Sequence, residues 1–122
     1  MSNFRLGSIS LDCADPLALA NFWASVLGGE VAFTSDDFVA VKLDRLWLST
    51  MRVEGYRPPT WPSGELPKEM HLDLAVADLE QGEAEILTLG AVKASTQPAP
   101  ERYRVFLDPA GHPFCLSTGI PD

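Results

Sequence analysis

The chain contains the same short pattern twice. The first copy, Ser8 to Asp15, reads SISLDCAD, and the second, His71 to Asp78, reads HLDLAVAD. Each copy alternates polar and apolar residues, ends in Asp, and runs into an amphipathic stretch that closes with Leu-Gly. A repeat of this kind restricts the possible folds before any single residue is interpreted.

The alternation in each copy predicts a strand with two different faces. In the first copy this strand covers residues 6–13. One face carries Ile9, Leu11 and Cys13, and the other carries Ser8, Ser10 and Asp12. Asp15 and Pro16 then suit an N-cap and a first helical position. The apolar spacing predicts a helix over 16–27 that ends at Gly28.

Short strands are expected after each helix. In the first half they lie at about 30–34, 38–43 and 47–53. The second half repeats the order, with a strand at 70–76, a helix at 79–89 capped by Asp78, and strands near 91–95, 103–107 and 114–118. The predicted core comprises Ile9, Leu11, Phe22, Trp23, Leu72, Leu74, Ile86 and Leu87.

The expected fold is therefore α+β, built from two βαβββ repeats. Side by side, two such units predict a half-open barrel with both helices outside and a shared polar cleft between the repeats. Clefts of this kind are usual places for small-molecule sites.

The whole chain, residues 1–122, is expected to form a single domain. Repeat one covers about 5–53 and repeat two about 70–118. The segment between them, about 54–69, holds four prolines and two glycines and is predicted to be an irregular linker. Tyr56 and Trp61 in this linker either fix it onto the barrel or cover the cleft, since large aromatic side chains generally seek burial.

The composition excludes some partners. The net charge is -8, and the nine Lys and Arg residues are scattered singly, which argues against nucleic acid and anionic membranes as partners. No apolar run reaches the ~20 residues of a membrane span, and no signal peptide opens the chain, so a cytoplasmic location is expected. The two cysteines, Cys13 and Cys115, fit a reduced compartment with free thiols.

Several motifs together carry a family resemblance. They are Asp15-Pro16, Asn21-Phe22-Trp23, Leu27-Gly28, His71-Leu72-Asp73-Leu74 and the run from Asp108 to Cys115. Over essentially its whole length the chain resembles the vicinal oxygen chelate superfamily, which includes glyoxalase I, extradiol dioxygenases, methylmalonyl-CoA epimerase, and the bleomycin and fosfomycin resistance proteins. The segment Pro58 to Pro62 is similar to a glyoxalase-like branch common in actinobacterial genomes, which implies a bacterial protein.

The resemblance also implies where metal ligands would stand. Metal-dependent members place one at the start of the first strand and one in the last strand of each repeat. Here the first-strand positions hold Ser8 and His71. The last-strand positions hold Cys115 and either Leu48 or Ser49. Three or four His or carboxylate ligands are not available, so we expect no catalytic metal and no other cofactor. Any metal would rest on His71 and Cys115, with help from Asp12 or Asp73.

His71 and Asp73 are the candidate catalytic residues. They share a strand face about 6.5–7 Å apart at the backbone, so the carboxylate could orient the imidazole. Cys115 is either a small buried hydrophobic residue or a nucleophile with a lowered pKa. The predicted ligand-binding residues are Ser8, Ser10, Trp47, Trp61, His71 and Cys115.

Two functions follow. The first is a metal-independent protein of the glyoxalase or bleomycin-resistance type that binds a small organic ligand. The alternative is a glyoxalase-like lyase or isomerase that uses His71 as a general base, with or without a divalent metal. An oxygenase would need ligands that the sequence lacks. A homodimer is expected, because sheet edges are usually paired or covered.

Overall fold

The computed structural model describes residues 2–3 and 5–121, and it divides into two compact units, Met1–Arg57 and Pro58–Asp122. The first unit contains β1 (Ser8–Cys13), α1 (Pro16–Leu27), β2 (Glu30–Thr34), β3 (Phe38–Lys42) and β4 (Trp47–Arg52). Its four-stranded sheet has the order β1-β4-β3-β2, with β1 parallel to β4 and the other pairs antiparallel.

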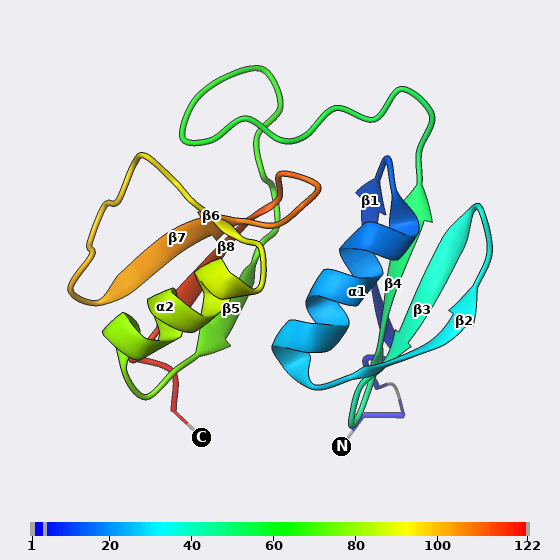
Figure 1. Ribbon diagram of the computed structural model, residues 1–122, viewed down its shortest axis with the longest axis horizontal. Helices are drawn as coiled ribbons and strands as arrows, with labels where there is room; N and C mark the ends of the chain where they lie inside the picture. The colour runs from blue at the N-terminus through cyan, green and yellow to red at the C-terminus, as the bar shows by residue number, and fades with distance from the viewer. Residues whose placement is uncertain (1, 4, 122) are drawn as a thin grey trace. The chain divides into compact units, whose positions relative to one another are not determined.

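The second unit repeats this arrangement. It contains β5 (Leu72–Ala75), α2 (Leu79–Thr88), β6 (Val92–Lys93), β7 (Tyr103–Leu107) and β8 (Pro113–Ser117). The sheet order is β5-β8-β7-β6, with β5 parallel to β8. In each unit the helix lies across one face of its own sheet (Figure 1). The α+β class and the two βαβββ repeats are confirmed.

The helix side of the first sheet is the core of that half. Leu19 and Trp23 of α1 are 1% exposed, and Val39, Val41 and Leu48 of the sheet are equally buried. Asp15 caps α1 by accepting a hydrogen bond from the Ala18 amide at 3.1 Å, as predicted. The buried Thr50 hydroxyl donates to the Pro16 carbonyl at 2.7 Å, which ties β4 to the start of the helix.

The second half has a thinner core, in which the rings of Phe106 and Phe114 lie 6.0 Å apart beneath α2. Ile86 of the helix is buried as predicted, but Leu87 is 41% exposed, so its assignment to the core was wrong. Adjacent helical residues point about 100° apart. The stripe that faces the sheet passes through Gly82 and Ile86, and Leu87 lies beside it. Ile9, Leu11, Leu72 and Leu74 are partly buried.

Much of the predicted linker lies in the second compact unit. We call residues 58–68 the proline strap. The Thr60 and Leu66 backbones bond to each other, and the Leu66 amide also donates to the Thr60 hydroxyl at 3.0 Å, which closes a small loop. At the other end, Pro58 packs so tightly on Gly111 that a Cβ built there would lie 2.6 Å from the Pro58 Cβ.

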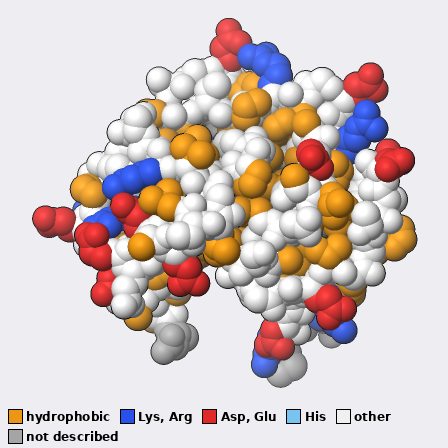
Figure 2. Space-filling model, in the orientation of Figure 1, with side chains coloured by type: hydrophobic (Ala, Val, Ile, Leu, Met, Phe, Trp, Pro, Cys, Tyr) orange, Lys and Arg blue, Asp and Glu red, His pale blue; other side chains and the backbone are white. Residues whose placement is uncertain are grey.

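The surface is rich in acidic side chains, and hydrophobic side chains are also exposed over the first half in the view of Figure 2. Leu17, Leu27 and Phe33 are among the exposed large hydrophobic residues of that half. No helix in the described part of the chain is long and apolar enough to cross a membrane.

Candidate functional site

A pocket lies on the face of the second sheet that points away from α2. Its volume is about 780 Å³, within the range usual for small-ligand sites. The side chains that matter for its chemistry are Trp61, Lys68, His71, Asp73, Tyr103 and Cys115. All of them belong to the second compact unit.

Strand alternation and register explain why these side chains meet. Side chains two residues apart on a strand share a face, which places Asp73 on the same side as His71 just before β5. Asp73 pairs with Cys115 of the neighbouring strand, and Cys115 pairs in turn with Val105 of β7. The intervening residues of β7 and β8, including Phe106 and Phe114, point to the opposite, helix-facing side.

Asp73 is the centre of the polar cluster. One of its carboxylate oxygens lies 3.4 Å from His71 Nε2. A carboxylate oxygen of Asp73 also lies within 4.8 Å of the Cys115 sulfur, close enough for the negative charge to act on the thiol. The His71 side chain is 32% exposed and that of Asp73 51% exposed, whereas Cys115 is only 4% exposed. The predicted pairing of His71 with Asp73 is therefore present, and Cys115 forms the floor beside it.

The electrostatics of Cys115 argue against a nucleophile. Burial raises the pKa of the thiol, and the negative charge of Asp73 raises it further, while the Lys68 ammonium acts in the opposite direction with a smaller effect. A thiol with a raised pKa stays protonated at neutral pH, and the thiolate is the reactive form. Of the two interpretations the sequence left open, the burial of Cys115 and the raised pKa of its thiol favour the small buried residue.

The proline strap provides one wall of the pocket. Trp61 and Lys68 both line it, and the Lys68 Nζ lies 4.7 Å from the centroid of the Trp61 ring, in cation–π geometry. Trp61 thus contributes to the pocket of its own half, whereas Tyr56 lies in the other compact unit.

The first sheet carries the corresponding positions without the titratable groups. Ser8 pairs with Trp47, and Ser10 pairs with Ser49, so all four lie on one face. Leu48 lies on the opposite face and is 1% exposed. Since Ser10 and Ser49 pair as Asp73 and Cys115 do, Ser49 and not Leu48 is the counterpart of Cys115. That Ser8, Ser10 and Trp47 share a ligand with the second half stays a prediction.

Six lining residues of the pocket were missed by the sequence analysis, namely Lys68, Leu72, Tyr103, Val105, Ser117 and Ile120. Tyr103 has the alternation signal, because it lies two residues before Val105 on the same face of β7. Lys68 has no periodic signal at all. It lies in the irregular segment, two residues after the loop that the Thr60–Leu66 bonds close, and it lines the pocket.

The donor groups of the pocket can be compared with the metal ligands that the superfamily uses. His71, Asp73 and Cys115 have ligand atoms within 4.8 Å of one another and are the residues that would hold a zinc ion, which accepts N, O and S donors. Hard ions such as manganese do not fit this set, because they prefer oxygen ligands and Asp73 alone supplies a carboxylate. A coordinating thiol must also lose its proton, which the raised pKa of Cys115 opposes.

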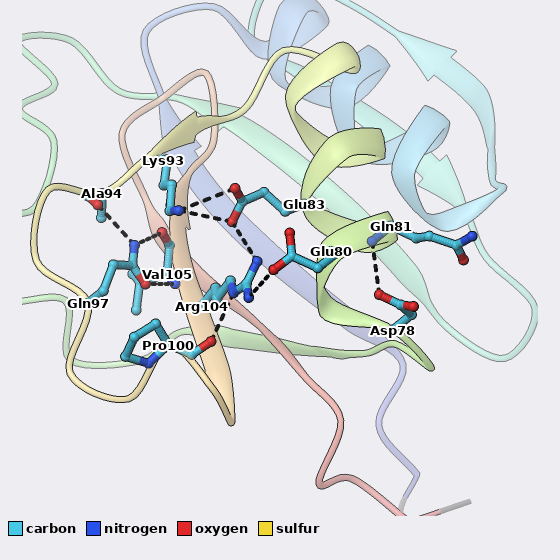
Figure 3. Close-up of polar contacts among 10 residues, drawn as sticks. All are labelled: Asp78, Glu80, Gln81, Glu83, Lys93, Ala94, Gln97, Pro100, Arg104 and Val105. Carbon is cyan, nitrogen blue, oxygen red and sulfur yellow. Dashed lines mark hydrogen bonds and ion pairs between the residues drawn. The ribbon is translucent and has the colours of Figure 1, made fainter.

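On the other side of the sheet, ion pairs fix α2 over β7. The Arg104 guanidinium contacts Glu80 at 2.8 Å and Glu83 at 3.2 Å, and Lys93 contacts Glu83 at 3.1 Å (Figure 3). The hydrogen bond from Arg104, followed by its positive charge, lowers the pKa of Glu80. The Gln97 side chain bonds both backbone groups of Val105, so the strand behind the pocket is held from its helix side and from the loop.

Several solved structures have the same fold as this chain, including the following three proteins. The fosfomycin resistance protein FosX from Listeria monocytogenes, in complex with manganese(II) and 1S,2S-dihydroxypropylphosphonic acid, is similar with a TM-score of 0.71. The identity is 17%, over 98% of this chain and 93% of that one. A glyoxalase family protein from Enterococcus faecalis is similar with a TM-score of 0.69. The identity is 20%, over 96% of this chain and 99% of that one.

A third similar structure is the oxidase ChaP-H2, with a TM-score of 0.67 and 21% identity over 98% of this chain and 96% of that one. At these identities the likeness shows the fold. The sequence has no significant match among curated proteins. The family model described as a glyoxalase-like domain matches residues 8–117, which is nearly the whole chain and spans both repeats. The chain therefore belongs to the glyoxalase-like domain family, within the vicinal oxygen chelate superfamily.

Proposed function

We propose that this protein binds a small organic ligand in the pocket of its second half. The observation that carries the proposal is the convergence of Trp61, His71, Asp73 and Cys115 on one cavity of about 780 Å³. The pocket combines aromatic walls with a few polar groups, which is typical of small-molecule sites. The FosX structure with a bound phosphonic acid is a family precedent for a small organic ligand.

The experiment begins with the wild-type protein and a library of planar aromatic compounds. A ligand close to Trp61 changes tryptophan emission, so fluorescence identifies binders. Calorimetric titration then gives the affinity of each binder for His71→Ala and Trp61→Ala. Each substitution is expected to weaken binding by about 1–3 kcal/mol, the usual cost of losing a desolvated contact.

The matched control is His112→Ala, which removes the chain's other histidine, in the turn between β7 and β8 and outside the pocket. This variant should bind like the wild type, and circular dichroism should confirm that all variants are folded. If the affinity of the binders is unchanged in both His71→Ala and Trp61→Ala, the site lies elsewhere and the proposal is refuted.

The second candidate is a lyase or isomerase that uses His71 as a general base. It is favoured by the 3.4 Å approach of His71 Nε2 to Asp73, because a carboxylate beside an imidazole can orient it for proton transfer. Such a base should exchange a C–H proton next to a carbonyl with solvent. NMR in heavy water on carbonyl-containing binders tests this, and the exchange should be lost in His71→Ala and slowed in Asp73→Asn. Binding without proton exchange would exclude the lyase or isomerase and support the binding function only.

A further inference from the structure

We propose that Lys68 is the residue that selects the ligand's charge, and that the pocket takes an organic acid, a carboxylate attached to a flat unsaturated body. This inference rests on the proposed binding function and names the ligand class for the same pocket. Lys68 lies on the proline strap, outside the regular elements of the sheet.

The first step is the charge inventory of the pocket. Among the described residues that line it, Lys68 is the only lysine or arginine. The one carboxylate there, Asp73, already lies 3.4 Å from His71 Nε2 and within 4.8 Å of the Cys115 sulfur. The Lys68 ammonium is therefore the charged group of the lining that can pair with an anionic ligand. Its positive charge also acts on Cys115 at the floor of the pocket.

The second step is the preorganisation of that ammonium. A free lysine side chain loses considerable rotamer freedom when it is immobilised by a ligand. Here the Nζ already lies 4.7 Å from the centroid of the Trp61 ring, and the Thr60–Leu66 bonds close the loop that carries this tryptophan. Part of the ordering cost is therefore met before a ligand arrives.

The third step concerns the field of the whole protein. The net charge of -8 gives a negative long-range potential that does not attract anions. Preference for an acid must then come from a local contact, and a charge-assisted hydrogen bond from an ammonium is such a contact. The rings of Trp61 and Tyr103 in the same lining would contact the flat body of the ligand.

The test uses a panel of planar aromatic carboxylic acids, each paired with its primary amide, which has the same shape and no charge. In the wild type the acids should bind tighter than their amides by roughly tenfold, as expected for a hydrogen bond to a charged group. Lys68→Met, which keeps an unbranched side chain one atom shorter and removes the charge, should bring each acid to the affinity of its amide. Lys68→Arg should retain most of the preference.

The control is Lys93→Met, which removes a lysine of the same half that pairs with Glu83 and does not line the pocket. It should keep the wild-type preference. An acid preference that persists in Lys68→Met, or equal binding of acids and amides to the wild type, would overturn the role of Lys68 while leaving the pocket function intact. Failure of every acid and every amide to bind the wild type would overturn both proposals.

Discussion

Asp73 lies directly opposite Cys115 in the parallel pairing of β5 with β8, and its carboxylate lies within 4.8 Å of the buried thiol sulfur. The same carboxylate lies 3.4 Å from His71 Nε2. The Asp73 carboxylate is therefore close to both the His71 imidazole and the buried Cys115 thiol, which makes Asp73 the most informative position for substitution.

Replacing Asp73 should alter the titration of Cys115. Burial and the Asp73 charge both raise the pKa of this thiol above its ordinary value of 9.0, so Asp73→Asn should lower it towards that value. The pH profile of iodoacetamide alkylation, followed by mass spectrometry in a Cys13→Ser background, should move to lower pH, with several-fold faster reaction near pH 8. Asp12→Asn, which changes an acid of the first half, should leave the profile in place. An unshifted profile in Asp73→Asn would contradict the assigned effect of the Asp73 charge on the thiol.

The Glu80–Arg104 pair should make stability depend on pH. The pKa of Glu80 is lowered in the folded protein, so its contribution is complete above the ordinary value of 4.5 and is lost as the pH falls through the folded-state value. The thermal midpoint of Glu80→Gln should be below that of the wild type at about pH 6 and should converge with it towards about pH 3. Glu85→Gln, on the same helix, should show no such convergence. Parallel curves for wild type and Glu80→Gln would count against the pair.

Substitutions at two glycines distinguish the cost of a strained backbone conformation from the cost of a steric clash. Gly55 has φ +70° with open space beside it, whereas Gly111 has φ +85° and faces the Pro58 Cβ at 2.6 Å from a built Cβ. Gly55→Ala should cost about 1 kcal/mol of unfolding free energy, the penalty of the left-handed region, and Gly111→Ala about 2–3 kcal/mol. Urea unfolding measures both. Gly111→Ala should also weaken ligand binding because it displaces the strap, and equal costs at the two positions would argue against the Pro58 contact.

The metal content of the purified protein tests whether the available side chains can hold a metal ion. Protein purified without chelator or affinity tag should hold only substoichiometric manganese, iron, nickel and zinc, because Ser8 and Ser49 are poor ligands and burial raises the pKa of the Cys115 thiol. Elemental analysis by mass spectrometry gives the content. A full equivalent of zinc that disappears in Cys115→Ser and Asp73→Asn would refute this expectation and would identify the three-donor group as a metal centre.

A homodimer is the expected assembly. The first sheet has β1 and β2 at its edges, and unpaired edges are usually covered or paired in native proteins. Light scattering at micromolar concentration should give about twice the 13.3 kDa of one chain. A particle of single-chain mass at that concentration would exclude the dimer.

The regular elements could be predicted closely from the sequence because alternation and capping are local signals. The predicted helix over 16–27 matches Pro16–Leu27, since Asp15 and Gly28 mark both of its ends. Leu87 was assigned incorrectly because α2 has few apolar residues, and the choice of its buried stripe depends on Gly82, which lets the helix approach Val76 and Leu116.

The candidate site was only partly predictable. His71, Asp73 and Cys115 follow from strand periodicity, but whether Leu48 or Ser49 corresponds to Cys115 depends on strand register, which the sequence does not specify. Lys68 could not have been found, because an irregular segment has no period and its path is set by bonds such as those between Thr60 and Leu66.

The residues that line the pocket all lie within 58–122, so the two copies of the fold differ in the groups they carry at equivalent positions. Equivalent sheet positions hold hydroxyl groups at Ser8, Ser10 and Ser49 in one copy, and an imidazole, a carboxylate and a thiol in the other. In a duplicated fold, one copy can retain the functional side chains while the surface residues of the other copy change. Engineering a new specificity into this protein would therefore begin with the strap and leave the sheet that carries His71 untouched.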